Sequence, residues 1–103
     1  MAQTSRISSN NTVILNYNDE QNGENVRSVI LHRTEIVRVI GNKVRFNTGG
    51  FFTKTTQRRM MQVCNEWNLP FTLGFHKGKE YVADRAGNVI KFFAGSPAVE
   101  VEM

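Results

Sequence analysis

The sequence predicts the α+β class, with a small antiparallel sheet of about five to six strands and one central helix packed on one face. Three observations support this prediction. Segments in which apolar and polar residues alternate occur on both sides of residues 55–67. Residues 55–67 alone repeat their apolar side chains with a helical period. The connections between the alternating segments are too short for parallel crossovers, so neighbouring strands are expected to run antiparallel.

Four strands are expected before the helix. Residues 12–17 form a short apolar run rich in β-branched side chains, with asparagine-rich segments on both sides. Residues 26–31 and 35–40 carry apolar side chains on both faces, so each strand needs some cover on both sides. Gly41-Asn42 separates residues 35–40 from residues 43–46, and this spacing predicts a hairpin with a tight turn.

The helix is expected over residues 55–67, because four apolar side chains recur at helical spacing and share one face: Met60, Val63, Cys64 and Trp67. Thr55 is the preferred N-cap, since its hydroxyl can accept a hydrogen bond from a free amide of the first turn. Asn68 tolerates the left-handed conformation that ends helices, and Pro70 cannot continue one.

Further strands are expected after the helix. Residues 71–76 and 80–84 flank a turn that contains Gly78, which predicts a second hairpin, and residues 89–94 follow another turn. The segment 95–103 alternates valine with glutamate and is either loose or a terminal edge strand. The predicted organisation is a flexible N-terminal tail (1–11), a single α+β domain (12–94) and a C-terminal tail (95–103).

Length and composition exclude several classes of protein. A chain of 103 residues supports one hydrophobic core, and 40% hydrophobic with 10% aromatic residues excludes disorder. The single cysteine excludes a disulfide framework and a thiolate metal cluster. No stretch approaches the roughly 20 apolar residues of a membrane span, and residues 1–11 lack the pattern of a signal peptide. A cytoplasmic protein is therefore expected.

Positive charge is concentrated in the middle of the chain. Residues 26–91 carry twelve basic and four acidic side chains, whereas both flanking segments are acidic on balance. A positive surface raises the encounter rate with polyanions, of which nucleic acid is the commonest in a cell. The alternative is a lysine surplus that serves only solubility.

Residues 47–56, which read NTGGFFTKTT, connect the last early strand to the helix. Successive glycines before a helix can expose amides to a phosphate, but they more often form the turn itself. Threonine hydroxyls have the same two interpretations, because they cap helices and also contact phosphates. The candidate residues of this motif loop are Asn47, Gly49, Gly50, Phe51, Thr53, Thr55 and Thr56.

This segment, with Thr34-Glu35-Ile36 upstream, resembles a group of small uncharacterised proteins from tailed bacteriophages and related mobile elements. The resemblance covers residues 31–84 and rests on an Asn-x-Gly-Gly-aromatic-x-Thr-x-Thr-Thr motif. This chain departs from the group at Phe51, where tryptophan is more usual, and at His32, where tyrosine is frequent. The resemblance implies a phage protein that acts in the bacterial host cytoplasm, and it implies no activity.

Basic residues on the helix and on neighbouring strands form the candidate binding surface. Arg58 and Arg59 lie in the first helical turn, where the helix dipole disfavours cations by roughly 0.3–1 kcal/mol, so another reason for their presence is expected. The alternative is a merely solvated helix face. The candidate nucleic-acid or partner-binding residues are Arg45, Lys54, Arg58, Arg59, Gln62, Lys77 and Lys79.

Aromatic residues alternate with basic ones along the chain, as they do in proteins that bind single-stranded nucleic acid. Core packing is expected to account for most of these rings. In each of the pairs Phe51-Phe52 and Phe92-Phe93, the alternation of a strand places the two rings on opposite faces, so one ring of each pair is expected to be exposed.

No residue pattern predicts an enzyme. His32 and His76 lack companion ligands at metal-binding spacing, and Cys64 lies on the predicted buried stripe, where it packs as a small apolar side chain. Neither a metal nor a cofactor is expected, and no membrane partner. The predicted function is that of a small basic phage-type accessory protein that binds DNA or RNA non-catalytically. The alternatives are a host-takeover or anti-defence inhibitor that binds a host protein complex through the same surface, and a structural role in the virion.

Overall fold

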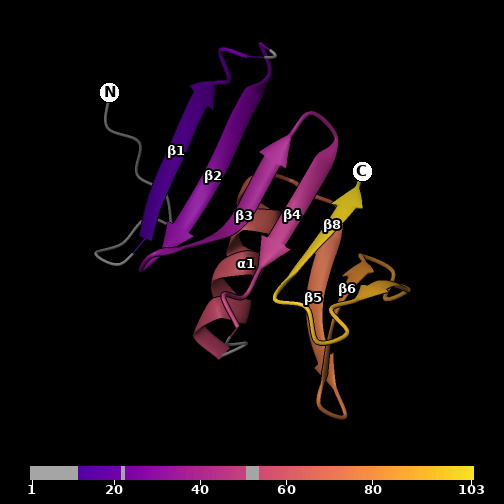
Figure 1. Cartoon of the computed structure of the whole chain (residues 1–103). Coiled ribbons are helices and arrows are strands. Elements are labelled where there is room, and N and C mark those ends of the chain that lie inside the picture. The colour runs from indigo at the N-terminus through magenta and orange to yellow at the C-terminus, as the bar shows by residue number, and fades with distance from the viewer. Residues whose placement is uncertain (1–11, 22, 51–53) are drawn as a thin grey trace.

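The structure is a computed structural model that describes residues 12–21, 23–50 and 54–103. In these ranges the chain forms eight strands and one helix (Figure 1), in the order β1 (Thr12–Asn18), β2 (Asn25–Leu31), β3 (Thr34–Ile40), β4 (Lys43–Asn47), α1 (Lys54–Glu66), β5 (Phe71–His76), β6 (Lys79–Asp84), β7 (Val89–Phe92) and β8 (Ala98–Glu102). The strands predicted from alternation are all present, and both predicted hairpins, β3–β4 and β5–β6, are confirmed. The predicted tail at residues 1–11 lies outside the described residues.

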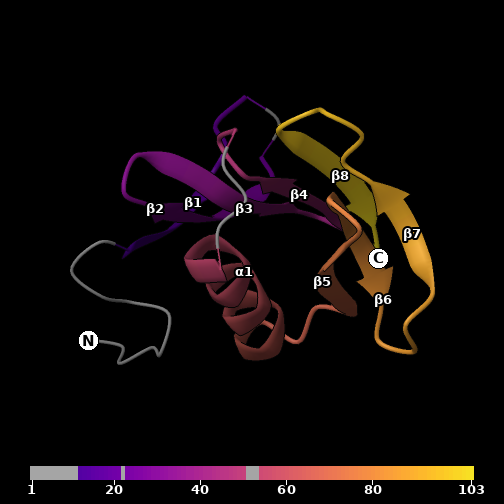
Figure 2. The ribbon, with the colours of Figure 1, turned by 90° about the horizontal axis from the view of Figure 1, so that it is seen from below.

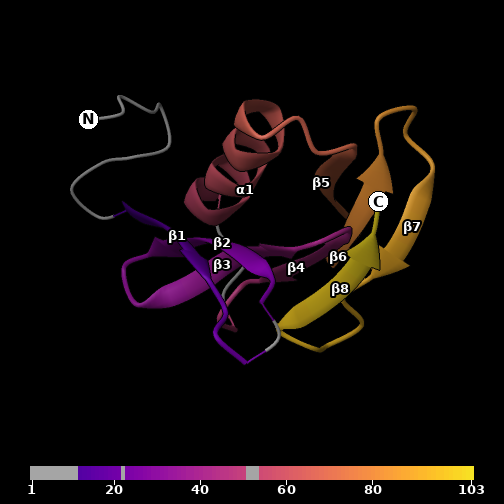
Figure 3. The ribbon, with the colours of Figure 1, turned by 90° about the horizontal axis from the view of Figure 1, so that it is seen from above.

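The predicted fold class is wrong. The described chain is mostly β, with its strands divided between two antiparallel sheets instead of one. Sheet A has the order β1-β2-β3-β4-β8, and sheet B has the order β5-β6-β7. Figures 2 and 3 show α1 on one side of sheet A, with sheet B beside the helix. The helix therefore packs on sheet A as expected, but it also contacts β5 of the second sheet.

The last strand explains the division into two sheets. β8 does not pair with its predecessor β7 but returns to the edge of β4, where Val99 lies opposite Phe46 and Val101 opposite Val44. This register buries both valines and leaves Glu100 and Glu102 exposed. The segment 95–103 thus contains an edge strand, one of the two alternatives that its sequence left open. β5, β6 and β7 then form a sheet of their own.

A single core lies between α1 and the inner faces of the two sheets. Met60, Val63 and Cys64 are buried, as the helical stripe predicts. Phe46 of sheet A meets Phe71 of sheet B edge to face, with ring centroids 6.1 Å apart. Complete burial of one such side chain stabilises the fold by about 1.5–3 kcal/mol, so this pair contributes strongly to holding the two sheets together.

The ends of α1 follow the predicted signals only in part. The helix begins at Lys54, so Thr55 lies inside it and the prediction of Thr55 as N-cap is wrong. The predicted end is confirmed: Asn68 has a left-handed φ of 55°, and the Leu69 amide donates to the Cys64 carbonyl at 2.8 Å. This reversal directs the chain into β5, which runs antiparallel to the helix (Figure 1).

Candidate functional site

The first turn of α1 and the turn between β5 and β6 lie at the same end of the molecule (Figure 1). The Gln57 side chain donates to the Leu73 carbonyl at 3.0 Å, which fixes the helix beside β5 at this end. Four exposed cations belong to the first two turns of α1 and to the β5–β6 turn with the residue after it, and we call this surface the basic end: Lys54, Arg58, Lys77 and Lys79. Sequence reasoning predicted all four as binding residues, and the fold brings them to one side.

The strand connections at this side of the molecule contain no carboxylate among their described residues. The β2–β3 turn holds His32 and Arg33, the β5–β6 turn holds Lys77 and Gly78, and the described parts of the other two connections are uncharged. The β1–β2 connection at the opposite end carries Asp19, Glu20 and Glu24, which we call the acidic loop. The acidic loop and the basic end therefore lie at opposite ends of the molecule, and an anion is attracted to the basic end.

Two of the predicted helix residues bind each other. The guanidinium of Arg59 donates to the side-chain oxygen of Gln62 at 2.9 Å, and both side chains are half-buried. Lys54 and Arg58 are exposed and line a shallow groove of about 470 Å³ together with Met61 and Asn65. The most accessible charges on this helix face belong to Lys54 and Arg58.

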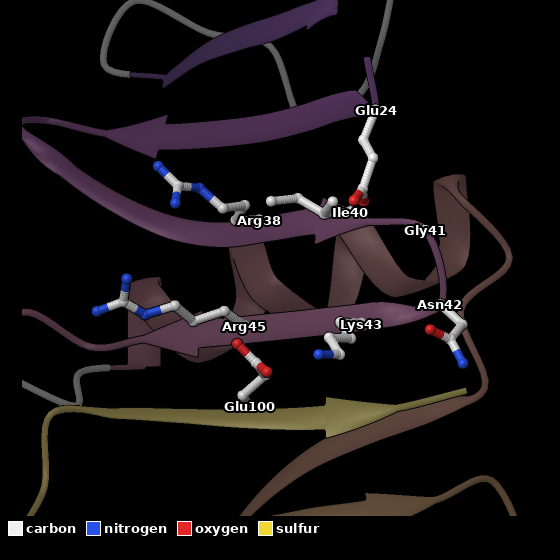
Figure 4. Close-up of a pocket in the computed structure, with 8 residues that line it drawn as sticks. All are labelled: Glu24, Arg38, Ile40, Gly41, Asn42, Lys43, Arg45 and Glu100. Atoms are coloured by element: carbon white, nitrogen blue, oxygen red, sulfur yellow. The ribbon is translucent and has the colours of Figure 1, made fainter. Parts of the chain in front are cut away.

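Arg45 lies apart from the other predicted residues. It pairs with Arg38 and Glu100 in neighbouring strands and points to the face of sheet A that is opposite α1. Figure 4 shows it in a depression of about 450 Å³ in which cations alternate with Glu24 and Glu100. Because these carboxylates offset the positive charge, this depression is less suited to a polyanion than the basic end.

The motif loop is explained largely by its own hydrogen bonds. The Asn47 side-chain oxygen accepts from the Gly49 amide at 2.9 Å, and the Thr48 hydroxyl accepts from the Gly50 amide at 3.2 Å. Gly49 and Gly50 have φ values of 69° and 94°, a conformation that L side chains rarely adopt. This geometry favours the interpretation of the glycine pair as a turn. Phe51 and Thr53 lie outside the described residues.

Between this loop, the β2–β3 turn and the helix start lies a hollow of about 360 Å³. Thr55 is exposed and Thr56 is buried at its rim. Its lining mixes threonine hydroxyls with apolar side chains and includes no acidic residue, lysine or arginine, and it adjoins the basic end. Its lining residues are Leu31, His32, Thr34, Ile36, Thr48, Gly49, Thr55 and Thr56.

Sequence reasoning missed two residues that the fold adds to this side of the molecule. Phe75, near the end of β5, is 55% exposed beside the Lys77 turn, and Arg33 is exposed in the β2–β3 turn. The sequence contained the information needed to place both residues, since antiparallel strands bring alternate connections to the same end of a sheet. The expectation for Phe92-Phe93 is confirmed: Phe92 is 46% exposed and Phe93 is buried.

The titratable residues offer little chemistry. Burial raises the pKa of the Cys64 thiol to about 12, in spite of the opposing charge of Arg85, so this thiol stays protonated and packs in the core as predicted. Within the described residues, no three His, Cys, Asp or Glu side chains gather where they could hold a metal ion. No helix in the described ranges has the length and hydropathy needed to cross a bilayer.

In the described residues, fold and surface define a small, mostly β protein with one helix and with four of its exposed cations at one end. The chain belongs to the Kyanoviridae Gp96 protein family, whose model matches residues 1–98. It is thus a phage protein, as the resemblance implied, although this match does not test the motif at residues 47–56. No curated protein matches the chain, and no solved structure does.

Proposed function

We propose that this phage protein binds nucleic acid non-catalytically through its basic end, in the cytoplasm of the bacterial host. The observation that carries the proposal is that the start of α1, with Lys54 and Arg58, and the β5–β6 turn, with Lys77 and Lys79, lie at the same end of the molecule and expose all four cations (Figure 1). Folding does not account for this arrangement, since neighbouring like charges repel and a cation in the first helical turn opposes the dipole. Phosphates would offset both costs.

The chemistry of the surface favours contacts to the nucleic-acid backbone over the reading of base sequence. Lysine and arginine bind phosphates irrespective of sequence, and all four residues that define the basic end are lysine or arginine. Phe75 is the one large ring exposed beside these cations in the described residues, and an exposed ring can stack on an unpaired base. We therefore expect single strands to bind better than duplexes.

Fluorescence anisotropy with labelled single- and double-stranded DNA and RNA, over a range of salt concentrations, tests the proposal. The triple variant Lys54→Gln/Lys77→Gln/Lys79→Gln should weaken binding to all sequences alike and reduce the logarithmic salt slope by about two to three units. The matched control is Lys43→Gln/Arg45→Gln/Lys91→Gln, which removes the same charge from exposed positions elsewhere. Equal losses in both variants would show that only net charge matters and would contradict the proposed site.

The second candidate function is inhibition of a host protein complex. The groove on α1 favours it, because Met61, one turn beyond Arg58, adds an apolar side chain to a lining that carries Lys54 and Arg58 and so suits an acidic segment with an apolar side chain. Met61→Glu should abolish capture of such a host protein and leave nucleic-acid binding nearly unchanged. If the parent protein binds no nucleic acid at low salt, the first proposal fails and this one remains.

A further inference from the structure

The outer edge of β1 has no partner strand in the part of the chain that the structure describes. Within the described residues, β1 pairs only with β2, and no other strand lies along its second edge. Its seven residues, TVILNYN, include no charged residue and no proline, and their pairing with β2 is regular throughout. Natural proteins usually protect such edges with charges, prolines or bulges, because an open edge pairs with other strands.

The opposite edge of sheet A shows the usual protection. β8 places Glu100 and Glu102 on the outer face, and it lies beside β7 of sheet B. An approaching strand would meet these carboxylates at β8 but none at β1. The two edges of one sheet thus differ in the feature that normally prevents association.

Apolar side chains on β1 reinforce the open edge. Val13, Leu15 and Tyr17 alternate along the outer face and are 50%, 41% and 46% exposed. Cross-strand partners share a face, so these three side chains adjoin Val26, Ile30 and, one strand further, Ile40. Further into the sheet this face is polar at its centre, because Leu15 lies opposite Ser28 and Ser28 lies opposite Arg38. The exposed apolar side chains are therefore concentrated on β1 itself, at the edge of the sheet.

We propose that β1 pairs antiparallel with β1 of a second copy, which joins two copies of sheet A into one continuous sheet. With the two-fold axis at Leu15, Leu15 faces the Leu15 of the second copy, and Val13 faces its Tyr17. Such a pairing extends the apolar surface across the interface and brings no two like charges together on the strands. It closes at a dimer, because each copy has one open β1 edge. The inference is independent of the proposed nucleic-acid binding.

Charge complementarity favours a second copy in this antiparallel orientation. β1 runs from the side of the Arg33 turn to the acidic loop with Asp19 and Glu20. Antiparallel pairing places the acidic loop of each copy beside the Arg33 turn of the other, two strand spacings or about 10 Å away. Parallel pairing would instead bring the two acidic loops together. The favourable contact occurs twice in the dimer by symmetry.

Sedimentation velocity of the full chain over a micromolar concentration series tests the inference. A one-strand interface is small, so a weak dimer that forms with rising concentration is expected. Leu15→Lys places two like charges opposite each other at the axis and should weaken association at least about tenfold. Val89→Lys is the matched control, since Val89 is 47% exposed on β7 and should leave association unchanged.

A charge pair tests the register. Val13→Lys and Tyr17→Glu should each weaken the dimer, and the double variant should restore it, because residue 13 of one copy faces residue 17 of the other. Thermal melts by circular dichroism verify that each variant is folded. A parent chain that stays monomeric, an associating Leu15→Lys variant, or a double variant without rescue would each overturn the proposed pairing.

Discussion

Gly49 and Gly50 make a sharp test of the loop that leads into α1, because the structure predicts different costs for the same change. Both residues have left-handed φ values, so alanine at either position is strained by about 1–2 kcal/mol. The stiffer unfolded chain offsets roughly 0.4–1 kcal/mol of this cost. Gly50→Ala, whose new methyl group meets open space, should therefore lower the free energy of unfolding by about 1 kcal/mol.

Gly49→Ala should cost more, because a Cβ atom at Gly49 would lie 2.8 Å from the Thr34 hydroxyl oxygen and 3.0 Å from its methyl carbon. Forcing an extra carbon into such a contact typically costs about 1–3 kcal/mol. The total expected loss is about 2–4 kcal/mol. Thr34→Ala removes both close atoms and leaves a Cβ–Cβ distance of 3.4 Å, so it should relieve the contact in the Gly49→Ala background.

Urea unfolding followed by the fluorescence of Trp67, the single tryptophan, measures these differences. The double-mutant cycle of Gly49→Ala with Thr34→Ala should give a favourable coupling of about 1–3 kcal/mol. The same cycle with Gly50→Ala is the control and should give almost none. If Gly49→Ala and Gly50→Ala lose equal stability, or both cycles give equal coupling, the loop does not pack on β3 as described.

Three further outcomes are expected. Thiol reagents should modify Cys64 only after unfolding. The free energy of unfolding should fall as pH rises from about 9 toward about 12, because the thiol of the unfolded chain ionises first. Cys64→Ala should abolish this contribution of the thiol to the pH dependence. The Asn88 backbone amide, with other donors of its turn, lowers the pKa of Asp84, so Asp84→Ala should destabilise the protein at neutral pH. Urea unfolding should show that the stability difference between parent and variant vanishes as the pH falls through the lowered pKa of Asp84. Val101→Ala should lower the unfolding free energy by roughly 1–3 kcal/mol if β8 is packed, and by nothing if residues 95–103 are loose.

Local periodicity was sufficient to locate the strands and the helix. Residues 43–46 alternate with a period of two, and Met60, Val63 and Cys64 recur with a helical period, because each pattern records which side faces the core. The positions of these elements were therefore predictable from short segments. The N-cap was not, since three threonines within four positions offered equivalent hydroxyls for one helix start.

The division into two sheets could not be read from local patterns. Val99 and Val101 show that the last strand has one buried face, but they do not say against which strand. Its partner β4 lies about fifty residues upstream, and the choice between β4 and β7 depends on how the whole core packs. Prediction of the candidate site failed for the same reason, because the sequence identified Arg45 and Lys54 as cations without showing that they lie on opposite sides of sheet A.

The proposed dimer and the proposed nucleic-acid site meet at Arg33. The β2–β3 turn lies between the open edge of β1 and the helix start, so Arg33 would face the partner's acidic loop in the dimer. β5 and β6, whose connecting turn carries Lys77 and Lys79, lie on the side of α1 away from β1 (Figure 2). An anion bound by these lysines would affect the dimer only if it also attracted Arg33 away from the partner's acidic loop. This attraction acts over a long distance, so it weakens as the salt concentration rises. Dimerisation and binding are therefore compatible at the lysines, and any antagonism between them should depend on Arg33.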